Sequence, residues 1–158
     1  MKRIKLDKID RKILDNLQRN GRITNIELSK NVGISAPPCL RRVRALEEAK
    51  FIKGYFARLD GTVLGYGLSI FALIKLVSQA ESDLKEFEQA CDNIERIREC
   101  HMLSGEVDFM LRIVAKDWDE YQKFLTEELT QINNVTTVKT MPLVRSSKEE
   151  PGIPINVD

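Results

Sequence analysis

Four side chains that can bind a metal or move protons lie within nine positions of one stretch, CHMLSGEVDFML. They are Cys100, His101, Glu106 and Asp108, and His101 is the only histidine of the chain. Because Cys100 and His101 would be neighbours on a strand, their side chains point to opposite faces and cannot easily share one metal. Both are expected to be packing residues. No second histidine, phosphate loop or paired nucleophile and base accompanies them, so we assign no catalytic residue, no metal ligand and no cofactor.

The distribution of charged residues divides the chain into a basic half and an acidic half. Residues 1–60 carry 15 Lys and Arg against 7 Asp and Glu, a net charge of +8. Residues 61–158 carry 10 against 17, a net charge of −7. A basic half joined to an acidic half indicates two modules, one of which faces a polyanion such as nucleic acid.

The remaining composition is typical of a cytoplasmic protein. Hydrophobic residues make up 42% and charged residues 31%, which predicts a packed fold. No apolar run approaches the roughly 18–20 residues that cross a membrane, and the N-terminal MKRIKLDKIDRK lacks the apolar core of a secretory signal. Cys39, Cys91 and Cys100 are odd in number and widely spaced, which favours reduced thiols over disulfides.

The basic half has the pattern of a helix-turn-helix. Asp7 can cap a first helix, and Thr24 with Glu27 gives a capping box for a second. Gly33 suits the left-handed residue of a tight turn, and Ser35 can cap a third helix. The three helices are expected within residues 7–21, 24–32 and 35–49. Residues 50–60 predict a short two-stranded wing or a strand that leaves the domain.

The third helix, SAPPCLRRVRALEEA, is the predicted DNA-recognition element. Its prolines fall in the first turn, where a missing N–H costs little, and its arginines project away from an apolar stripe. Such a helix enters the major groove with its N-terminal residues nearest the bases, where arginine meets guanine or phosphate. The alternative is a solvated basic helix on an ordinary helical bundle. The candidate DNA-binding residues are Ser35, Pro37, Pro38, Cys39, Arg41, Arg42 and Arg44.

The acidic half predicts an α+β, ferredoxin-like βαββαβ domain: a four-stranded antiparallel sheet with two helices on one face. The elements are a strand in 67–78, a helix in 81–93, strands in 95–104 and 106–115, a helix in 117–132 and a strand in 135–144. Asp117 and Glu120 should cap the second helix. Its expected inner face is Trp118, Tyr121, Leu125, Leu129 and Ile132.

The first of these strands is apolar on both of its faces, although helices cover only one. One face carries Leu68, Ile70, Ala72 and Ile74, and the other carries Phe71, Leu73 and Val77. A second copy of the chain is the economical cover for the second face, so we expect a homodimer that assembles further. The expected domains are residues 1–59 (winged helix-turn-helix), 60–66 (linker), 67–145 (ferredoxin-like, ligand-binding and dimerisation) and 146–158 (tail).

In order along the chain, four stretches resemble the Lrp/AsnC family of transcription regulators. They are LDKIDRKILDNLQRNGRITNIELSKNVGIS, PPCLRRVRALEEAKFIKGY, ECHMLSGEVDFML and NNVTTVKTMPLV. The resemblance implies a winged helix-turn-helix, a ferredoxin-like (RAM-type) effector domain, dimers that often form octamers, and a small amino acid bound between dimers. The implied effector-binding residues are Met102, Ser104, Gly105, Glu106, Val107 and Asp108. Members often have an aromatic residue near Val107, so leucine cannot be assumed as the effector.

The residues themselves support such a pocket. A carboxylate such as Asp108 can take the ammonium of an amino acid, and N–H groups around Gly105 can take its carboxylate. In the alternative reading, Gly105 is only a hairpin glycine and Asp108 a solvated edge residue. The sequence thus predicts a cytoplasmic, amino-acid-responsive regulator of double-stranded DNA that is not an enzyme. Two alternatives stay open, namely an architectural DNA-wrapping protein without an effector and a metalloregulator built on CHMLSGEVD.

Overall fold

The computed structural model describes residues 5–157, which divide into two compact units. The helical unit comprises residues 5–58 together with residues 148–157, and the sheet unit comprises residues 59–147. The N-terminal MKRI and Asp158, which belong to the first predicted domain and the predicted tail, lie outside the described residues. The division falls between Arg58 and Leu59 and again between Ser147 and Lys148.

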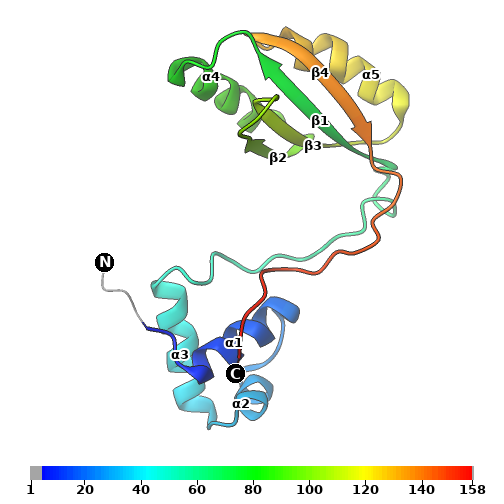
Figure 1. The fold of residues 1–158 in the computed structure, drawn as a ribbon. Helices are drawn as coiled ribbons and strands as arrows, with labels where there is room; N and C mark the ends of the chain where they lie inside the picture. Colours follow the sequence, from blue (N-terminus) through cyan, green and yellow to red (C-terminus); the bar gives the residue numbers. More distant parts are fainter. Residues whose placement is uncertain (1–4, 158) are drawn as a thin grey trace. The chain divides into compact units, whose positions relative to one another are not determined.

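Three helices form the core of the helical unit (Figure 1). They are α1 (Lys8–Arg19), α2 (Asn25–Val32) and α3 (Ala36–Glu48). Each is amphipathic, and their apolar faces meet in one buried cluster because that removes the most apolar surface from water. The buried members of the cluster are Ile13, Leu28, Val32, Cys39 and Leu46.

Local capping sets where these helices begin and end. The Asp7 side chain accepts a hydrogen bond from the Asp10 N–H at 2.8 Å, and the Asp10 side chain accepts one from the Asp7 N–H at 3.2 Å. Thr24 caps α2, and Gly33 ends it in the left-handed conformation with φ 78°. Ser35 occupies the N-cap position of α3, but within the described structure its side chain makes no capping bond. That part of the prediction was wrong.

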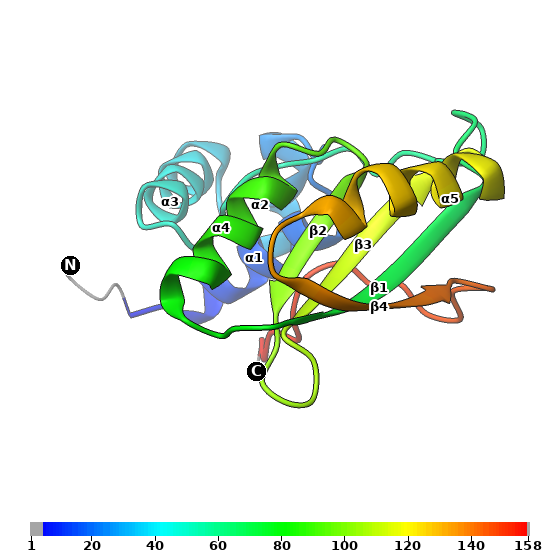
Figure 2. The same ribbon diagram turned by 90° about the horizontal axis from the view of Figure 1, so that it is seen from above.

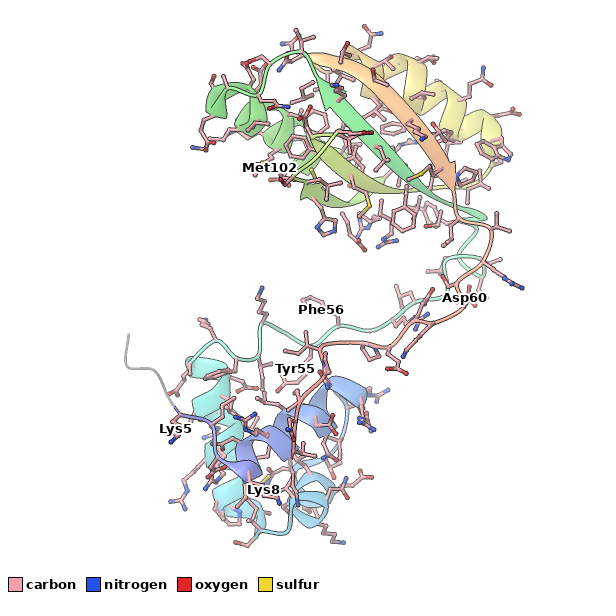
Figure 3. The ribbon with its side chains drawn as sticks, viewed as in Figure 1. Lys5, Lys8, Tyr55, Phe56, Asp60 and Met102 are labelled. Atoms are coloured by element: carbon pink, nitrogen blue, oxygen red, sulfur yellow. The ribbon has the colours of Figure 1, made fainter. Side chains whose placement is uncertain are left out.

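Residues 50–60 were predicted to form a two-stranded wing or a strand that leaves the domain, and residues 51–60 contain no strand pairing within the described chain. Side-chain contacts hold the segment instead, among them Ile52 packed against the helical core. The Tyr55 hydroxyl donates to a Glu47 carboxylate oxygen at 2.9 Å, and Figure 3 shows Tyr55 pointing toward the helices. Desolvation, with the Glu47 contact, raises the pKa of Tyr55 to about 12. Tyr55 therefore stays a neutral anchor between this segment and α3.

The sheet unit has the predicted βαββαβ order. Its elements are β1 (Leu68–Leu76), α4 (Glu81–Asp92), β2 (Ile97–Met102), β3 (Phe109–Ala115), α5 (Trp118–Glu127), the short 3-10 helix η1 (Leu129–Gln131) and β4 (Val135–Pro142). The strands form one antiparallel sheet in the order β2-β3-β1-β4. Alternation along β1 buries Ile70, Ala72, Ile74 and Leu76 on one face.

Helices α4 and α5 cover the same face of this sheet (Figure 2). The Phe87 ring of α4 contacts the Phe109 ring of β3, and the Tyr121 hydroxyl of α5 lies 2.6 Å from the Thr140 hydroxyl of β4. The predicted long helix ends early, because the chain tightens into η1 after Glu127. Trp118, expected inside, is 50% exposed.

The opposite face of the sheet carries apolar side chains that no helix covers. Phe71 on β1 lies opposite Met141 on β4, and Leu73 lies opposite Met110 on β3. Directly opposed residues of an antiparallel pair share a face, so these four form one patch, here termed the open-face patch. All four are partly buried in the single chain. No helix of the described residues is long and apolar enough to span a membrane.

Candidate functional site

The N-terminal half of α3 presents most of the predicted DNA-binding residues at the surface. Ser35, Pro37, Arg41 and Arg44 are exposed, and Pro38 is partly exposed. The two prolines stand in the first turn, as predicted. Because Ser35 makes no capping bond within residues 5–157, its hydroxyl is available to an outside partner. An exposed helix start with nearby arginines can hold phosphate by both its dipole and its charge.

Cys39 does not belong to this surface. Its side chain is 0% exposed and lies in the core between the helices. Burial raises the pKa of the Cys39 thiol, which keeps it neutral. The prediction that Cys39 contacts DNA is corrected for this reason: the residue faces inward, on the same side of α3 as Leu46.

Arg42 is engaged within the protein. Its Nη1 lies 2.7 Å from Asp7 Oδ2 and 2.7 Å from Asp10 Oδ1, so one guanidinium joins α3 to both carboxylates at the start of α1. These hydrogen bonds raise the pKa of Arg42 further above its already high value. Arg42 thus holds α3 against the start of α1. The sequence showed Asp7 and Asp10 only as helix caps, and no local spacing links them to Arg42.

The β2–β3 hairpin brings together all the predicted effector residues. Leu103 N–H donates to the Asp108 carbonyl at 2.8 Å and closes a loop around Ser104–Val107. Met102, labelled in Figure 3, is 61% exposed at the end of β2. Gly105 has φ 152°, a backbone conformation that favours glycine.

The loop exposes backbone donors. Among the described residues, none accepts a hydrogen bond from the N–H groups of residues 104–107. Ser104, Gly105 and Glu106 are exposed, and Val107 is half-buried. A run of unpaired N–H groups beside a glycine is a common way for proteins to bind an anion such as a carboxylate.

Asp108 is buried, with 6% of its surface exposed, and it organises the base of the hairpin. Its Oδ2 accepts from the Leu76 N–H at 2.7 Å, and its Oδ1 accepts from Gln79 Nε2 at 2.7 Å. The alternative of a solvated edge residue is therefore wrong. A carboxylate has about four acceptor sites, so each oxygen keeps one for a further donor. Gln79, which the sequence gave no reason to select, becomes part of the site.

The four reactive side chains of CHMLSGEVDFML lie in different environments. Cys100 packs against the core of the sheet unit, whereas His101 is exposed and its Nε2 lies 3.3 Å from Glu99 Oε2. The expectation that both are packing residues holds for Cys100 only. Within residues 5–157 there is no grouping of three His, Cys, Asp or Glu side chains able to hold a metal ion.

Two family models match this chain. Residues 6–53 match a winged helix-turn-helix DNA-binding model, and residues 69–153 match the Lrp/AsnC ligand-binding domain. The chain belongs to the Lrp/AsnC family of transcriptional regulators. As a member, it pairs a helix-turn-helix DNA-binding domain with an amino-acid ligand-binding domain of the α+β type.

Individual relatives extend over almost the whole chain. A leucine-responsive regulatory protein of Rhizobium meliloti is 50% identical over 147 residues, which is 93% of this chain and 94% of that protein. The Escherichia coli K12 protein of that name is 42% identical, covering 91% of this chain and 88% of its own length. A Neisseria meningitidis regulator, solved as a complex with L-Met, superimposes with a TM-score of 0.91 at 32% identity, covering 96% and 98% of the two chains.

Removing Arg42 should destabilise the helical unit, whereas removing its neighbour Arg41 should not. Arg42→Ala leaves the largely buried Asp10 carboxylate without its partner, and we expect a loss of about 1–2 kcal/mol in the free energy of unfolding. Arg41→Ala, a change at an exposed site, should stay within about 0.5 kcal/mol. Urea denaturation of both variants measures the difference, and equal stabilities would contradict the structural role of Arg42.

The difference between these variants should shrink in acid. The hydrogen bond from the Asp10 N–H, assisted by Arg42, lowers the pKa of Asp7. A lowered folded-state pKa means that ionised Asp7 stabilises the fold above its unfolded value of about 3.9, and that this contribution is lost as pH falls through the folded value. Repeating the denaturation at successively lower pH, below the unfolded pKa of Asp7, should therefore bring Arg42→Ala progressively closer to the wild type.

Proposed function

We propose that this regulator binds operator DNA through α3 and that a small amino acid at the β2–β3 hairpin changes its assembly or its DNA affinity. The observation that carries the proposal is the pairing of two surfaces in one chain. One is a helix start with exposed arginines, and the other is a hairpin with unpaired backbone donors. A cytoplasmic location goes with the proposal, because a DNA regulator must reach the chromosome.

Arg41 and Arg44 are the side chains proposed to reach DNA. Both are exposed on the helix whose start also carries the exposed Ser35. Arginine can contact guanine with two hydrogen bonds or neutralise phosphate. Arg42 contributes by holding α3 in place through Asp7 and Asp10, with its other guanidinium nitrogens left for a phosphate. Pro37 and Pro38 complete the surface by fixing the first turn of the helix.

The proposed ligand is an amino acid with a free carboxylate and ammonium. Its carboxylate would accept from the N–H groups of residues 104–107, and its ammonium would meet the exposed Glu106 or the spare acceptor sites of Asp108. Met102 and Val107 supply apolar surface for a side chain. The L-Met complex of the Neisseria regulator supports this class of ligand.

The active form is proposed to be a homodimer, with octamers as the larger assembly that the resemblance implies. The open-face patch needs cover, and a second sheet unit supplies an apolar face of the same shape. A dimer also places two α3 helices against two operator half-sites. An effector shifts such an assembly only as far as its affinities for the two states differ.

A ligand-independent architectural role is the second candidate. The observation that favours it is that both oxygens of Asp108 already accept bonds from within the chain, so the acid is occupied without any ligand. In that case, the hairpin would be only a structural turn, and DNA wrapping would follow from assembly alone. An effector titration distinguishes the two.

Arg41→Ala and Arg44→Ala should each weaken operator binding while the oligomer persists. Losing one phosphate contact should reduce the slope of log affinity against log salt by about 1, and losing a base contact should cost about 1–3 kcal/mol. Fluorescence anisotropy at several salt concentrations measures both. Lys85→Ala, which removes an exposed cation on α4, is the control and should leave binding unchanged. Wild-type affinity in both arginine variants would rule out the proposed docking.

At least one of the twenty amino acids should raise the melting temperature of the protein. A ligand that binds only the folded state stabilises it by about 2.7 kcal/mol at 100 times its Kd. Gly105→Ala should abolish the shift, because the hairpin must change shape, and Glu106→Gln should weaken it if Glu106 holds the ammonium. Glu127→Gln on α5 serves as the charge-matched control. The absence of any shift across the panel would favour the architectural role.

Leu73→Glu should convert the dimer to monomers. A charge in the centre of the open-face patch would have to be buried without a partner, which costs several kcal/mol. Light scattering after size exclusion reports the mass. Gln122→Glu, at an exposed site on α5, is a control for added charge alone. A Leu73→Glu protein that keeps the wild-type mass would show that dimers form elsewhere.

A further inference from the structure

The C-terminal segment, residues 148–157, belongs to the helical unit although it follows the last strand of the sheet unit. The helical unit is thus built from both ends of the chain. The chain consequently runs between the two units twice, once after Arg58 and once before Lys148. Figure 1 shows the segment in red beside the helices of this unit.

Gln18 on α1 makes the central contact with the segment. Its Oε1 accepts from the Ile153 N–H at 3.1 Å, and its Nε2 donates to the Ile153 carbonyl at 3.0 Å. The side-chain amide thereby pairs with both backbone groups of one residue, as a neighbouring strand would. This arrangement recognises an extended backbone whatever its side chains are.

Two arginines hold the segment on either side of this pair. The Arg11 Nη1 donates to the Asn156 carbonyl at 3.4 Å. Arg58 forms an ion pair with the Glu149 carboxylate and also lies 3.5 Å from the Glu149 carbonyl oxygen. Contacts therefore extend from Glu149 to Asn156 and come from α1 and from the segment that follows α3.

The segment has the backbone shape that these contacts require. Gly152 has φ 79°, a backbone conformation that residues other than glycine rarely adopt. A Cβ built at Gly152 would overlap the amide of Gln18, and that amide is held in place by its two bonds to Ile153. Shape and contact thus restrict this position to glycine.

We propose that Arg11, Gln18 and Arg58 form a docking surface for the chain's own C-terminal segment, Glu149–Asn156. The occupant is an extended peptide, recognised through its backbone by Gln18 and Arg11 and through an acidic side chain by Arg58. Docking gives the helical unit a second attachment to the rest of the chain. It also engages two cations of the basic half, Arg11 and Arg58, with carbonyl and carboxylate oxygens.

Hydrogen exchange at the Ile153 amide in the full-length protein tests the docking. The amide should exchange at least ~10-fold more slowly than in a synthetic peptide of residues 147–158, because it must open before it exchanges. Gln18→Ala and Gly152→Ala should each remove this protection. Lys148→Ala, whose ion pair is with the neighbouring Glu150, is the control and should keep it. Peptide-like exchange in the wild type, or full protection in Gln18→Ala, would overturn the proposal.

A crosslink identifies whose segment is docked. In a Cys100→Ser background, the Asp15→Cys/Ile153→Cys protein, which keeps Gln18 and places a thiol beside its amide, is treated with a short bismaleimide, and its mass is read under denaturing conditions. Docking within one chain predicts a crosslinked monomer. A crosslinked dimer would assign the surface to the segment of a second copy and overturn the intramolecular assignment.

Discussion

A carboxylate taken out of water must find hydrogen-bond donors, and the shape of the β2–β3 hairpin depends on how Asp108 meets this requirement. Its two oxygens accept from the end of β1 at Leu76 and from the Gln79 side chain, while its own backbone N–H donates to Ile74. One buried acid therefore connects β1, the segment that precedes α4 and the hairpin. With its base fixed in this way, the loop can leave its backbone donors unpaired.

The helical unit uses carboxylates in the same manner. Asp7 and Asp10 satisfy the free N–H groups at the start of α1, and Arg42 then joins both to α3. Helix α3 is thus positioned by one of its own arginines, and the others remain for a polyanion. In both units, a charged side chain with partners inside the protein positions a surface: Arg42 positions α3, and Asp108 positions the β2–β3 hairpin. Each surface carries polar groups that have no partner among the described residues.

Short-range features were predictable from the sequence because their partners lie within four residues. Asp7, Thr24 and Asp117 cap their helices as expected, although among the described residues Glu27 does not complete the predicted capping box, and Gly33 adopts the expected left-handed turn. The succession of strand-like and helix-like segments likewise predicted the βαββαβ order. Even so, Glu120 accepts from the Lys116 N–H where a capping box would use that of Asp117.

Most of the wrong predictions concern features that depend on tertiary packing. Cys39 is an exception, since it lies four and seven positions before Val43 and Leu46, and this helical spacing already favours the core. Helical spacing alone does not show that Trp118, in the first turn of α5, faces the solvent. Nor does it show that Arg42 meets acids 32 and 35 positions away. The C-terminal segment looked like a polar tail because a backbone docked by Gln18 leaves no pattern in its side chains.

Reciprocal coupling between effector and DNA tests the central claim most directly. If an amino acid at the hairpin alters DNA affinity, then DNA must alter the affinity for that amino acid by the same factor. Calorimetric titration of the effector into the free protein and into its operator complex measures this factor. The account predicts two different Kd values whose ratio equals the effector-induced change in DNA affinity. Identical Kd values with and without DNA would contradict it.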